Sequence, residues 1–478
     1  MSLIRHLRPF FERYEHRVFL RPVGNKRMNY GEVWKEAETR ATMMRATDRK
    51  GCVMVIRPNS KEWVVDVLAG LMANRNVVPV SFRTPRATVF KILGEFKPAF
   101  VSSSSGLVPA DFHSSTSSQE TEEATITLLT SGSSGGGSAI ELEQSNIVAN
   151  LDQIHRVVPH TMIGMEDESF AILPWSHCYG MTCELFFLAT RGASLHLPRM
   201  ESIPYDLYRA RPTLVFAVPV LVEKVVRMVP PIASVFGNTL LGGRLKAVSV
   251  GGARSDPTTL QSFEERFGVQ IFEGYGMTEC SPMIALNTSL AKRMASVGRV
   301  LPGMQVRIDT QTGEILVRGD NVAQSLSSHR YTTLDRLRYL KTGDRGYMDE
   351  DGFLYIQDRI SDHFKLANGI FIYPQRIEDV FRVHRPIGVS HWMAVPDAQC
   401  ASILLVGFMT SDHQSFPGLT KDDIERIAKD AGLVGREVPA DVLYLTAKES
   451  ANFLTEKQTP RRGLLVSFIH DRLKSRLK

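Results

Sequence analysis

Short apolar runs alternate with amphipathic stretches along most of the chain. Three of these runs are typical of strands: residues 52–56, 77–80 and 99–101. Residues 63–72 have helical spacing, and the alternation resumes at Ile126 and continues to about Ile356. Strands separated by helices predict βαβ units and a parallel sheet. We therefore expect an α/β fold with a large N-terminal domain of layered parallel sheets and helices.

The pattern becomes shorter and more mixed after residue 358, with a strand-like run at 402–408. We place a boundary there, which gives an N-terminal domain of residues 1–358 and a smaller, mobile α+β domain of residues 359–478. A C-terminal domain of about 120 residues is within the normal size range of a domain. Residues 102–124 are rich in Ser, Thr and Glu, which predicts a surface loop.

Both ends of the chain have an amphipathic helical pattern. The first stripe consists of Leu3, Leu7, Phe10, Phe11 and Tyr14. The last consists of Leu465, Ile469, Leu473 and Leu477, in a basic segment. We expect each stripe to pack on its own domain. Weak contact with a membrane surface is the alternative for both helices, and a protein partner is a further alternative for the last.

Composition narrows the class of protein. The 478 residues are 43% apolar and 23% charged, which is ordinary for a globular protein. The net charge of +6 gives no reason to expect nucleic-acid binding. Five cysteines without C-x-x-C spacing argue against a disulfide framework or a cysteine-based zinc site, and favour a reducing compartment. Without a secretory signal or a spanning segment, we expect a cytoplasmic protein, or one peripheral to a membrane.

A glycine-rich loop follows the apolar run at 126–129. Residues 130–138 read Thr-Ser-Gly-Ser-Ser-Gly-Gly-Gly-Ser, so backbone N–H groups and hydroxyls are available to hold phosphate. A flexible linker is the alternative. A Walker A loop is excluded because Ser138 stands in place of its lysine. The segment 132–136 fits G-x-S-x-G, but the glycines after Ser134 disfavour the helix that a nucleophile elbow needs.

Four further motifs follow in order. They are Leu-Pro-Trp-Ser-His-Cys-Tyr-Gly at 173–180, Val-Ser-Val-Gly-Gly-Ala at 248–253, Gly-Tyr-Gly-Met-Thr-Glu at 274–279, and Lys-Thr-Gly-Asp at 341–344 with Asp-Arg at 358–359. Together with the glycine-rich loop they resemble the adenylate-forming (AMP-binding) superfamily of acyl-CoA synthetases, luciferases and peptide-synthetase adenylation domains. The resemblance extends from about residue 25 to 460. Residues 365–369, with Pro374, look most like long-chain fatty acyl-CoA synthetases.

The resemblance implies a two-step ligase reaction. A carboxylate joins the α-phosphate of ATP and expels pyrophosphate, and a thiol then takes the acyl group. The implied partners are ATP, Mg²⁺, a carboxylic acid (most simply a fatty acid), and CoA or an acyl carrier protein. Because two anions must meet, catalysis depends on positioning and on charge neutralisation.

The same resemblance assigns the nucleotide site. Phosphates would be cradled by Thr130, Ser131, Gly132, Ser133, Ser134 and Gly135. The adenine would lie among Gly251, Gly252, Ala253, Tyr275, Gly276 and Met277, with Tyr275 stacked on it. Thr278 would donate to the α-phosphate, Glu279 would hold Mg²⁺, and Asp344, supported by Arg359, would accept from the ribose hydroxyls.

The acyl site and the moving parts are implied in the same way. The acyl pocket would be lined by Trp175, His177, Val218, Gly274 and Gly276. A purely structural role is the alternative for His177. The C-terminal domain would rotate about a hinge at Ser361, and Lys365 would act in the thioester-forming state.

Several positions depart from the family pattern. Ser138 stands where a phosphate-loop lysine is usual, and Gly463 aligns with the lysine that the C-terminal domain delivers during adenylation. Substitutes for the second lysine are Lys457, Arg461 and Arg462, although arginine is a planar fork rather than a point charge. Ser361 replaces the usual Lys or Asp of the hinge, and Arg376 replaces a glutamate while Glu378 remains.

Three hypotheses are therefore open. The first is a fatty acyl-CoA or acyl-carrier-protein ligase. The second is a degenerate homologue that binds a nucleotide or an acyl group as a scaffold or regulator. The third is a ligase that stops at acyl-AMP and hands it to a protein partner. The sequence does not choose the chain length, the acceptor or the oligomeric state.

Overall fold

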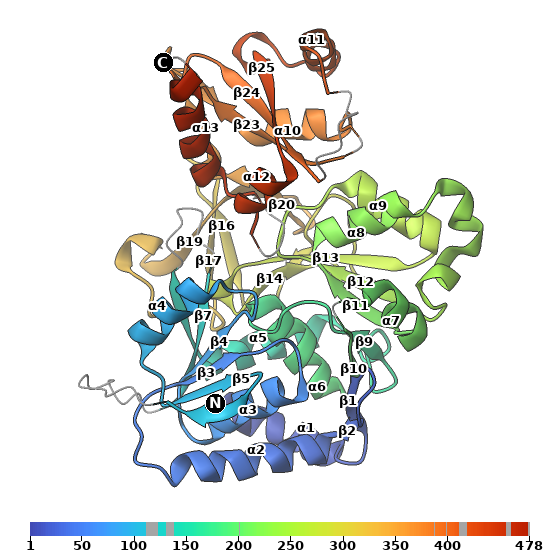
Figure 1. Cartoon of the computed structure of the whole chain (residues 1–478), viewed down its shortest axis with the longest axis vertical. Coiled ribbons are helices and arrows are strands. Elements are labelled where there is room, and N and C mark those ends of the chain that lie inside the picture. The colour runs from blue at the N-terminus through green and yellow to red at the C-terminus, as the bar shows by residue number, and fades with distance from the viewer. Residues whose placement is uncertain are drawn as a thin grey trace.

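The computed structural model has a large N-terminal α/β part and a smaller C-terminal domain above it (Figure 1). It describes residues 1–110, 123–130, 138–199, 201–386, 388–397, 399–410, 418–455 and 460–476, and in helices the side chains of 231–235 and 473–476 are excluded. The predicted phosphate-loop residues Ser131, Gly132, Ser133, Ser134 and Gly135 and the candidate Lys457 lie outside this description.

The first sheet has six strands in the order β6-β5-β3-β4-β7-β8. The strands are β3 (Val53–Ile56), β4 (Val77–Val80), β5 (Phe100–Ser103), β6 (Gly106–Pro109), β7 (Thr125–Leu129) and β8 (Ala139–Glu143). β5, β3, β4 and β7 are parallel, and β6 and β8 add antiparallel edges. The helices of this part are α2 (Tyr30–Arg45), α3 (Lys61–Met72) and α4 (Arg86–Phe96). The apolar runs at 52–56, 77–80 and 99–101 are thus confirmed as strands.

The expectation of a loop throughout 102–124 is wrong at its start. Gly106, at φ +109°, allows a tight reversal after β5, and β6 then pairs back on β5 as an edge strand. Leu107 and Val108 supply the strand-forming residues that the high Ser content of the segment obscured. Residues 111–122 of the same segment lie outside the described structure.

The second sheet has nine strands in the order β15-β14-β13-β12-β11-β9-β10-β1-β2. The strands are β1 (Val18–Pro22), β2 (Met28–Asn29), β9 (Glu168–Phe170), β10 (Ser194–Leu197), β11 (Leu214–Ala217), β12 (Ala247–Val250), β13 (Gln270–Gly276), β14 (Met283–Leu286) and β15 (Arg299–Val300). The six strands from β13 to β1 in this order are parallel. Its helical segments are α1 (Leu3–Arg13), α5 (Gln144–Val157), the π-helix η1 (Tyr179–Phe186), α6 (Phe187–Arg191), α7 (Ile203–Ala210), α8 (Pro219–Met228), the 3-10 segment η2 (Pro231–Leu241) and α9 (Pro257–Phe267).

A third, antiparallel sheet connects the N-terminal part to the C-terminal domain. It contains β16 (Gln305–Ile308), β17 (Glu314–Arg318), β18 (Tyr331–Leu334), β19 (Leu337–Met348) and β20 (Leu354–Arg359). Two short 3-10 turns matter for the site, η3 (Thr278–Cys280) and η4 (Ser328–Arg330).

The C-terminal domain is α+β, as expected. It comprises η5 (Ile360–Asp362), β21 (Phe364–Lys365), β22 (Phe371–Ile372), α10 (Pro374–Arg382), β23 (Val389–Pro396), β24 (Ile403–Met409), α11 (Lys421–Asp430), η6 (Gly435–Glu437), β25 (Asp441–Leu445), α12 (Ala447–Asn452) and α13 (Arg462–Arg476). β24 confirms the strand predicted at 402–408.

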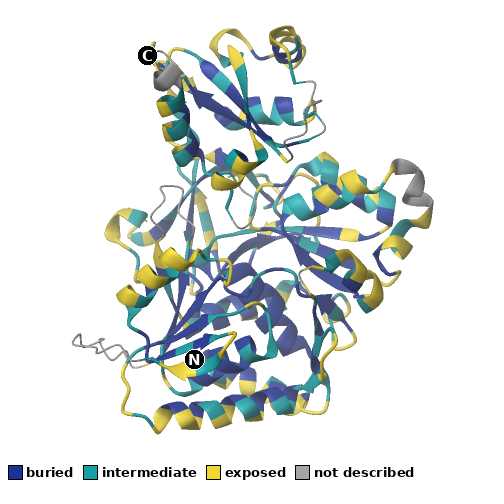
Figure 2. Ribbon diagram, viewed as in Figure 1, coloured by how far each residue is buried: buried dark blue, intermediate teal, exposed yellow. Residues whose placement is uncertain are grey.

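Burial follows the sheets and the inward faces of the helices (Figure 2). The hydrophobic clusters do not cross between the two parts among the residues described: three use residues up to Leu354, and two use residues from Leu366 onward. The N-terminal stripe packs inward, because Leu3, Leu7 and Phe11 lie in the first core. In the C-terminal stripe, Leu465 and Ile469 lie in the last core, whereas the side chains of Leu473 and Leu477 are outside the described structure.

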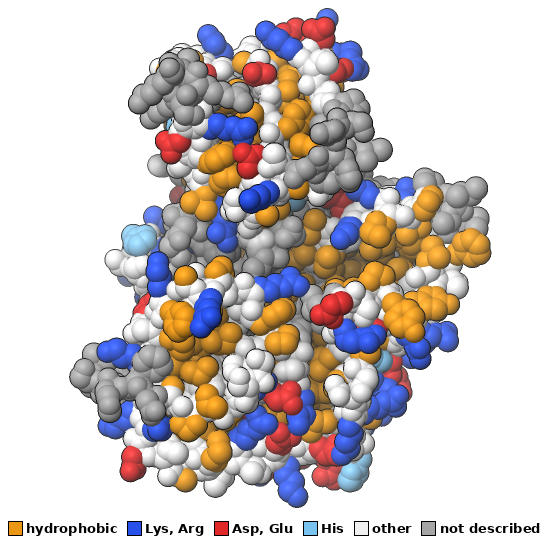
Figure 3. Space-filling view, viewed as in Figure 1, with side chains coloured by type: hydrophobic (Ala, Val, Ile, Leu, Met, Phe, Trp, Pro, Cys, Tyr) orange, Lys and Arg blue, Asp and Glu red, His pale blue; other side chains and the backbone are white. Residues whose placement is uncertain are grey.

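Charge is dispersed over the visible face. Lys and Arg side chains alternate there with Asp and Glu side chains (Figure 3). Within the described part of the chain, no helix combines the length and apolarity that crossing a bilayer requires.

Candidate active site

The motif residues meet at the carboxyl ends of the parallel strands β12 and β13, where open α/β sheets usually bind ligands. The Gly251-Gly252-Ala253 turn follows β12, and Tyr275 and Gly276 end β13. A small cavity of about 40 Å³ opens there. It is lined by residues 178–179, 251–252 and 274–278, with Pro282 and Met283.

Tyr275, Asp344 and Arg359 form one hydrogen-bonded group. The Tyr275 hydroxyl donates to Asp344 Oδ2 at 2.7 Å, and Arg359 Nε donates to Asp344 Oδ1 at 2.9 Å. Asp344 and Arg359 are direct partners in the β19–β20 register, which brings the two motifs together. The Asp344 carboxylate raises the pKa of Arg359, and burial, followed by Asp344, raises the pKa of Tyr275. The buried carboxylate is thus held between two donors from different strands.

Two glycines of β13 leave room for close packing at the cavity. A Cβ on Gly276 would lie 2.0 Å from the Pro282 carbonyl oxygen, where the Met277 N–H donates at 2.9 Å. A Cβ on Gly274 would meet Met283 Sδ at 2.9 Å. Gly276 is therefore required by the backbone, whereas Gly274 borders a flexible side chain.

Thr278 and Glu279 begin the 3-10 turn η3 beside this cavity. Glu279 is 8% exposed, and its Oε1 accepts from Arg330 Nη2 at 2.9 Å. The part of the chain that the structure describes contains no group of three or more His, Cys, Asp or Glu that could hold a metal. Mg²⁺ commonly uses one or two carboxylates together with the phosphates of its substrate. Glu279 fits that requirement as a single protein ligand.

The glycine-rich loop is closed at its base. Both the backbone N–H and the hydroxyl of Thr130 donate to the Ser138 carbonyl, at 2.9 and 3.0 Å. Leu129 and Ala139 then pair in the β7–β8 ladder, and β8 packs against η3. The two ends of the loop are therefore fixed on the side of the site where Thr278 and Glu279 lie.

The 173–180 motif is anchored from behind. Asn59 Nδ2 donates to the Leu173 carbonyl at 2.7 Å, and Asn59 Oδ1 accepts from the Trp175 backbone at 2.9 Å. Trp175 is fully buried, and His177 is partly buried beside it. Trp175, His177 and Val218 do not line the small cavity that Gly274 and Gly276 border. Trp175 and Val218 belong to the main core.

Glu184 is a buried carboxyl that sequence inspection missed. It accepts from the Ser169 hydroxyl at 2.8 Å and from Trp175 Nε1 at 3.3 Å. Burial raises its pKa from 4.5 to about 8. The signal available in the sequence was a single acid within the otherwise uncharged run 178–190. Glu184 lies in a π-helix, a feature that is frequent at functional positions. Its hydrogen bond with Trp175 Nε1 fixes the orientation of the Trp175 ring.

A second, apolar cavity of about 40 Å³ lies behind the first. Its walls include Val215, Phe216, Phe272 and Leu286, from β11, β13 and β14. Met283 lines both cavities. A change in the conformation of this flexible side chain would therefore alter both cavities.

Ion pairs connect the two domains beside the Gly251-Gly252-Ala253 turn. Arg254 Nη2 lies 2.8 Å from Asp379 Oδ2, and Arg382 Nη2 lies 3.4 Å from Asp256 Oδ1. Arg385 also pairs with Glu223. These contacts border a cavity of about 230 Å³ between α8, α9 and α10.

The predicted functional positions of the C-terminal domain lie in different environments. Arg462 Nη2 donates to Glu378 Oε1 and its Nη1 to the Ala394 carbonyl, both at 2.6 Å, so Arg462 is committed to its own domain. Gly463 lies in the first turn of α13. Ser361 is exposed in η5, and Lys365 is exposed on β21, with Nζ 5.4 Å from the centre of the Phe371 ring.

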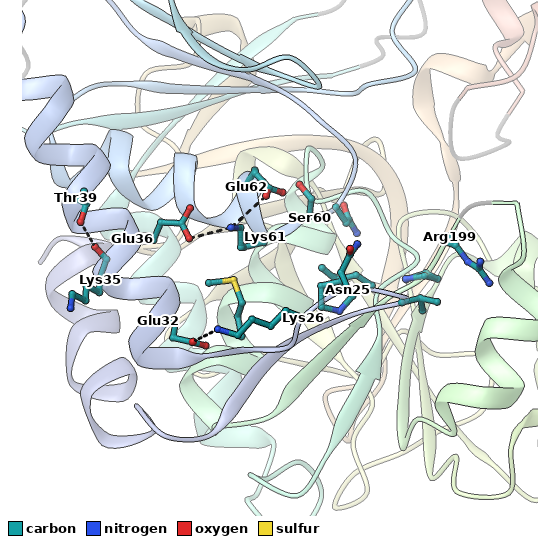
Figure 4. A pocket seen from close by; sticks show the side chains of 16 residues that line it. Asn25, Lys26, Glu32, Lys35, Glu36, Thr39, Ser60, Lys61, Glu62 and Arg199 are labelled. Carbon is teal, nitrogen blue, oxygen red and sulfur yellow. Dashed lines mark hydrogen bonds and ion pairs between the residues drawn. The ribbon is translucent and has the colours of Figure 1, made fainter.

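A much larger cavity, of about 850 Å³, lies elsewhere (Figure 4). Five of its charged side chains pair with one another: Lys26 with Glu32 at 3.0 Å, and Lys61 with Glu36 at 3.3 Å and with Glu62 at 3.6 Å. None of the sequence-motif residues assigned to the nucleotide or acyl site lines it. The cavity of about 40 Å³ at the ends of β12 and β13 is therefore the better candidate for the nucleotide site.

Comparison with known proteins shows which proteins this chain is similar to. Residues 102–326 match a family model described as AMP-binding enzyme. The chain is 28% identical to a 2-succinylbenzoate–CoA ligase of Enterococcus faecalis over 281 residues, which cover 55% of each protein. It is also 28% identical to a long-chain-fatty-acid–CoA ligase of Yersinia pestis over 315 residues, which cover 60% of this chain and 53% of that protein. These matches span little more than half the length of either relative.

Solved structures extend the similarity of fold to nearly the whole chain. An anthranilate CoA ligase, AuaEII, in complex with anthranoyl-AMP has a TM-score of 0.79 at 16% identity and covers 99% of this chain and 98% of its own. ATP-bound MatB from Rhodopseudomonas palustris has a TM-score of 0.80 at 18% identity, over 98% and 99%. MenE from Bacillus subtilis, in complex with ATP and a magnesium ion, has a TM-score of 0.73 at 18% identity, over 96% and 98%. The chain thus shares its fold with these solved structures, and residues 102–326 match the AMP-binding enzyme model.

Proposed function

From this adenylate-forming fold and its AMP-binding segment, we propose that the protein is an acid–thiol ligase. It activates a carboxylic acid with ATP and transfers the acyl group to the thiol of CoA or of an acyl carrier protein. The observation that carries the proposal is the convergence of Tyr275, Asp344 and Arg359 beside the Gly251-Gly252-Ala253 turn. These residues come from separate parts of the chain and meet only in the folded protein.

The nucleotide side of the reaction uses this group. Tyr275 offers a ring for the adenine, and Asp344 offers carboxylate oxygens, each with a further lone pair, for the ribose hydroxyls. Thr278 and the loop that begins at Thr130 contact the phosphates. Mg²⁺, held by Glu279 and the phosphates, would neutralise charge on the triphosphate.

The chemical steps are two displacements. An oxygen of the substrate carboxylate bonds to the α-phosphorus, the bond from that phosphorus to the bridging oxygen breaks, and pyrophosphate leaves. The sulfur of the thiol then bonds to the acyl carbon, AMP leaves with the electron pair of the carbon–oxygen bond, and the thiol proton passes to solvent. Rotation of the C-terminal domain about Ser361 separates the two steps.

The apolar cavity behind Met283 favours an acid with an apolar body, fatty or aromatic. Its walls are carbon-rich and mostly buried, and polar groups are few. At about 40 Å³ the compartment must widen before it can hold such a body. Met283 and Met162 line it, and their unbranched side chains move at low cost.

ATP–pyrophosphate exchange tests the proposal. Purified protein with Mg²⁺ is assayed with acids from acetate to palmitate and with aromatic acids. Acid-dependent exchange supports adenylation and ranks the acids. A product assay with and without CoA then separates a complete ligase from one that hands acyl-AMP to a protein partner.

One observation favours a second candidate, a degenerate nucleotide- or acyl-binding protein. Arg462 is engaged with Glu378, and the neighbouring Gly463 has no side chain to take the role of the lysine. Absence of exchange with every acid, while ATP still binds, would select this candidate.

A further inference from the structure

The proposed reaction needs positive charge beside the phosphates, and the residues assigned so far do not supply it. A triphosphate and a carboxylate must come together, and positive charge has to stabilise them and the leaving pyrophosphate. Ser138 and Gly463 stand where lysines were expected. A different cation should therefore lie on the phosphate side of the site.

Arg330 is a basic side chain on that side. It ends the short turn η4, and its Nη2 lies 2.9 Å from Glu279 Oε1. The side chain of Arg330 is 31% exposed and that of Glu279 10%. Arg330 is thus held at the site while part of it remains accessible to a ligand.

The segment that carries Arg330 is hydrogen-bonded both to η3 and to β8, the strand that follows the glycine-rich loop. The Ala323 N–H donates to the Glu279 carbonyl at 2.8 Å, and the Tyr331 hydroxyl donates to the Ala323 carbonyl. The Ser325 hydroxyl donates at 3.3 Å to the Glu141 carbonyl on β8, the strand that follows the glycine-rich loop. Arg330 is therefore supported between η3 and the base of that loop.

The guanidinium has capacity beyond Glu279. It carries five N–H donors in a planar fork that matches phosphate oxygens. Among the residues that the structure describes, Glu279 alone accepts a hydrogen bond from the Arg330 guanidinium. A carboxylate has two oxygens, so Glu279 can orient Arg330 through one and remain available to Mg²⁺ through the other.

We propose that Arg330 is a further catalytic residue, which binds the nucleotide's phosphate oxygens and the leaving pyrophosphate and so replaces the charge that is missing at Ser138. This inference rests on the proposed function. It assigns the neutralising role to a residue 192 positions after the missing lysine, with Glu279 fixing its side chain.

The test measures ATP affinity calorimetrically in EDTA, so that it does not depend on turnover or on Mg²⁺. Arg330→Gln should weaken ATP binding about tenfold or more, the loss expected for one charged hydrogen-bond partner of a phosphate. Arg330→Lys should recover part of it. Arg307→Gln, which removes an equal charge from an exposed position on β16, should leave it unchanged.

Restoring the expected lysine provides the decisive comparison. Ser138→Lys should improve ATP binding and exchange more in the Arg330→Gln background than in the wild-type protein, because the two cations serve one anion. An Arg330→Gln variant that binds ATP like the wild type would overturn the inference. Equal gains from Ser138→Lys in both backgrounds would do the same.

Two readouts keep the failures apart. If the wild-type protein shows no acid-dependent exchange, the proposed ligase function fails, while the ATP-affinity series still decides the role of Arg330. If the wild type exchanges and Arg330→Gln matches it in both affinity and exchange, the inference alone fails. The unfolding midpoint of each variant checks that a lost salt bridge has not merely loosened the fold.

Discussion

Arg254 donates across the domain boundary to Asp379, with Nη2 and Oδ2 2.8 Å apart. The same guanidinium donates through Nη1 to the Gln357 carbonyl at 2.7 Å, two residues before the last residue of β20. Because Arg254 directly follows the Gly251-Gly252-Ala253 turn, one side chain connects the candidate nucleotide site, the connection between the domains and the C-terminal domain.

Arg254→Gln should loosen this orientation of the C-terminal domain. A partly exposed ion pair contributes about 0.5–1 kcal/mol, which corresponds to a roughly two- to fivefold change in the population of the released state. The rate of limited proteolysis within residues 359–363 measures that release. Arg426→Gln, which removes an arginine paired within its own helix α11, should leave the rate unchanged. Equal cleavage of the two variants would argue against a connecting role.

Gly274→Ala should alter the choice of acid. The added methyl group would meet the Met283 side chain, which can move, and would crowd the wall that the two cavities share at Met283. We expect kcat/KM for a long or aromatic acid to fall about tenfold relative to acetate, the scale of one misfitting methyl group. The matched change Gly276→Ala meets the Pro282 carbonyl oxygen, which cannot move freely, and should impair all acids alike. A uniform loss in Gly274→Ala would contradict the expectation.

Glu184→Gln should change how stability depends on pH. The folded protein keeps the Glu184 proton up to about pH 8, whereas an unfolded glutamate loses it near pH 4.5. The unfolded state therefore binds fewer protons between these values, and the stability contributed by Glu184 falls as pH rises through that window. Glutamine stays neutral at every pH. The free energy of unfolding of the variant should therefore rise relative to that of the wild type from pH 5 to pH 8, by several kcal/mol at pH 8.

Urea unfolding at several pH values measures this difference. Comparing the variant with the wild type cancels the contributions of other groups, and exposed Glu350→Gln supplies a control without a buried carboxyl. Parallel stability curves for the wild type and Glu184→Gln would show that Glu184 is ionised in the folded protein.

Arg462→Gln should destabilise the C-terminal domain rather than weaken ATP binding. Removing one partner of a buried ion pair costs about 3–5 kcal/mol because the other charge is left without compensation. The double change of Glu378 and Arg462 to leucine should cost less than the sum of the single changes. Thermal unfolding measures both. If Arg462→Gln instead lost ATP affinity at unchanged stability, Arg462 would be the substitute for the missing lysine.

The fold was largely predictable because its elements are local and regular. Spacing alone predicts the strand at 402–408 and the helix at 63–72. The family resemblance implies that Tyr275, Asp344 and Arg359 serve one nucleotide site, and the three side chains are hydrogen-bonded in the folded chain. The edge strand β6 escaped because its two apolar residues stand in a segment rich in serine.

The site was less predictable because its key contacts are between distant residues. Arg330 and Glu279 are 51 positions apart and share no motif, so they meet only in the folded chain. The raised pKa of Glu184 depends on the burial of a π-helix that periodicity does not reveal. Trp175 lies in the predicted motif, but its indole N–H is directed to Glu184 and its ring packs in the core. In each case tertiary packing, rather than residue type, decides the role.

The division of the hydrophobic clusters between the two domains has an evolutionary and practical consequence. Since the described contacts that bind one domain to the other include polar pairs such as Arg254–Asp379, each core can accumulate substitutions without repacking the other. The C-terminal domain can then be exchanged, in evolution or by experiment, for one that carries a lysine at the position of Gly463 without repacking the N-terminal core.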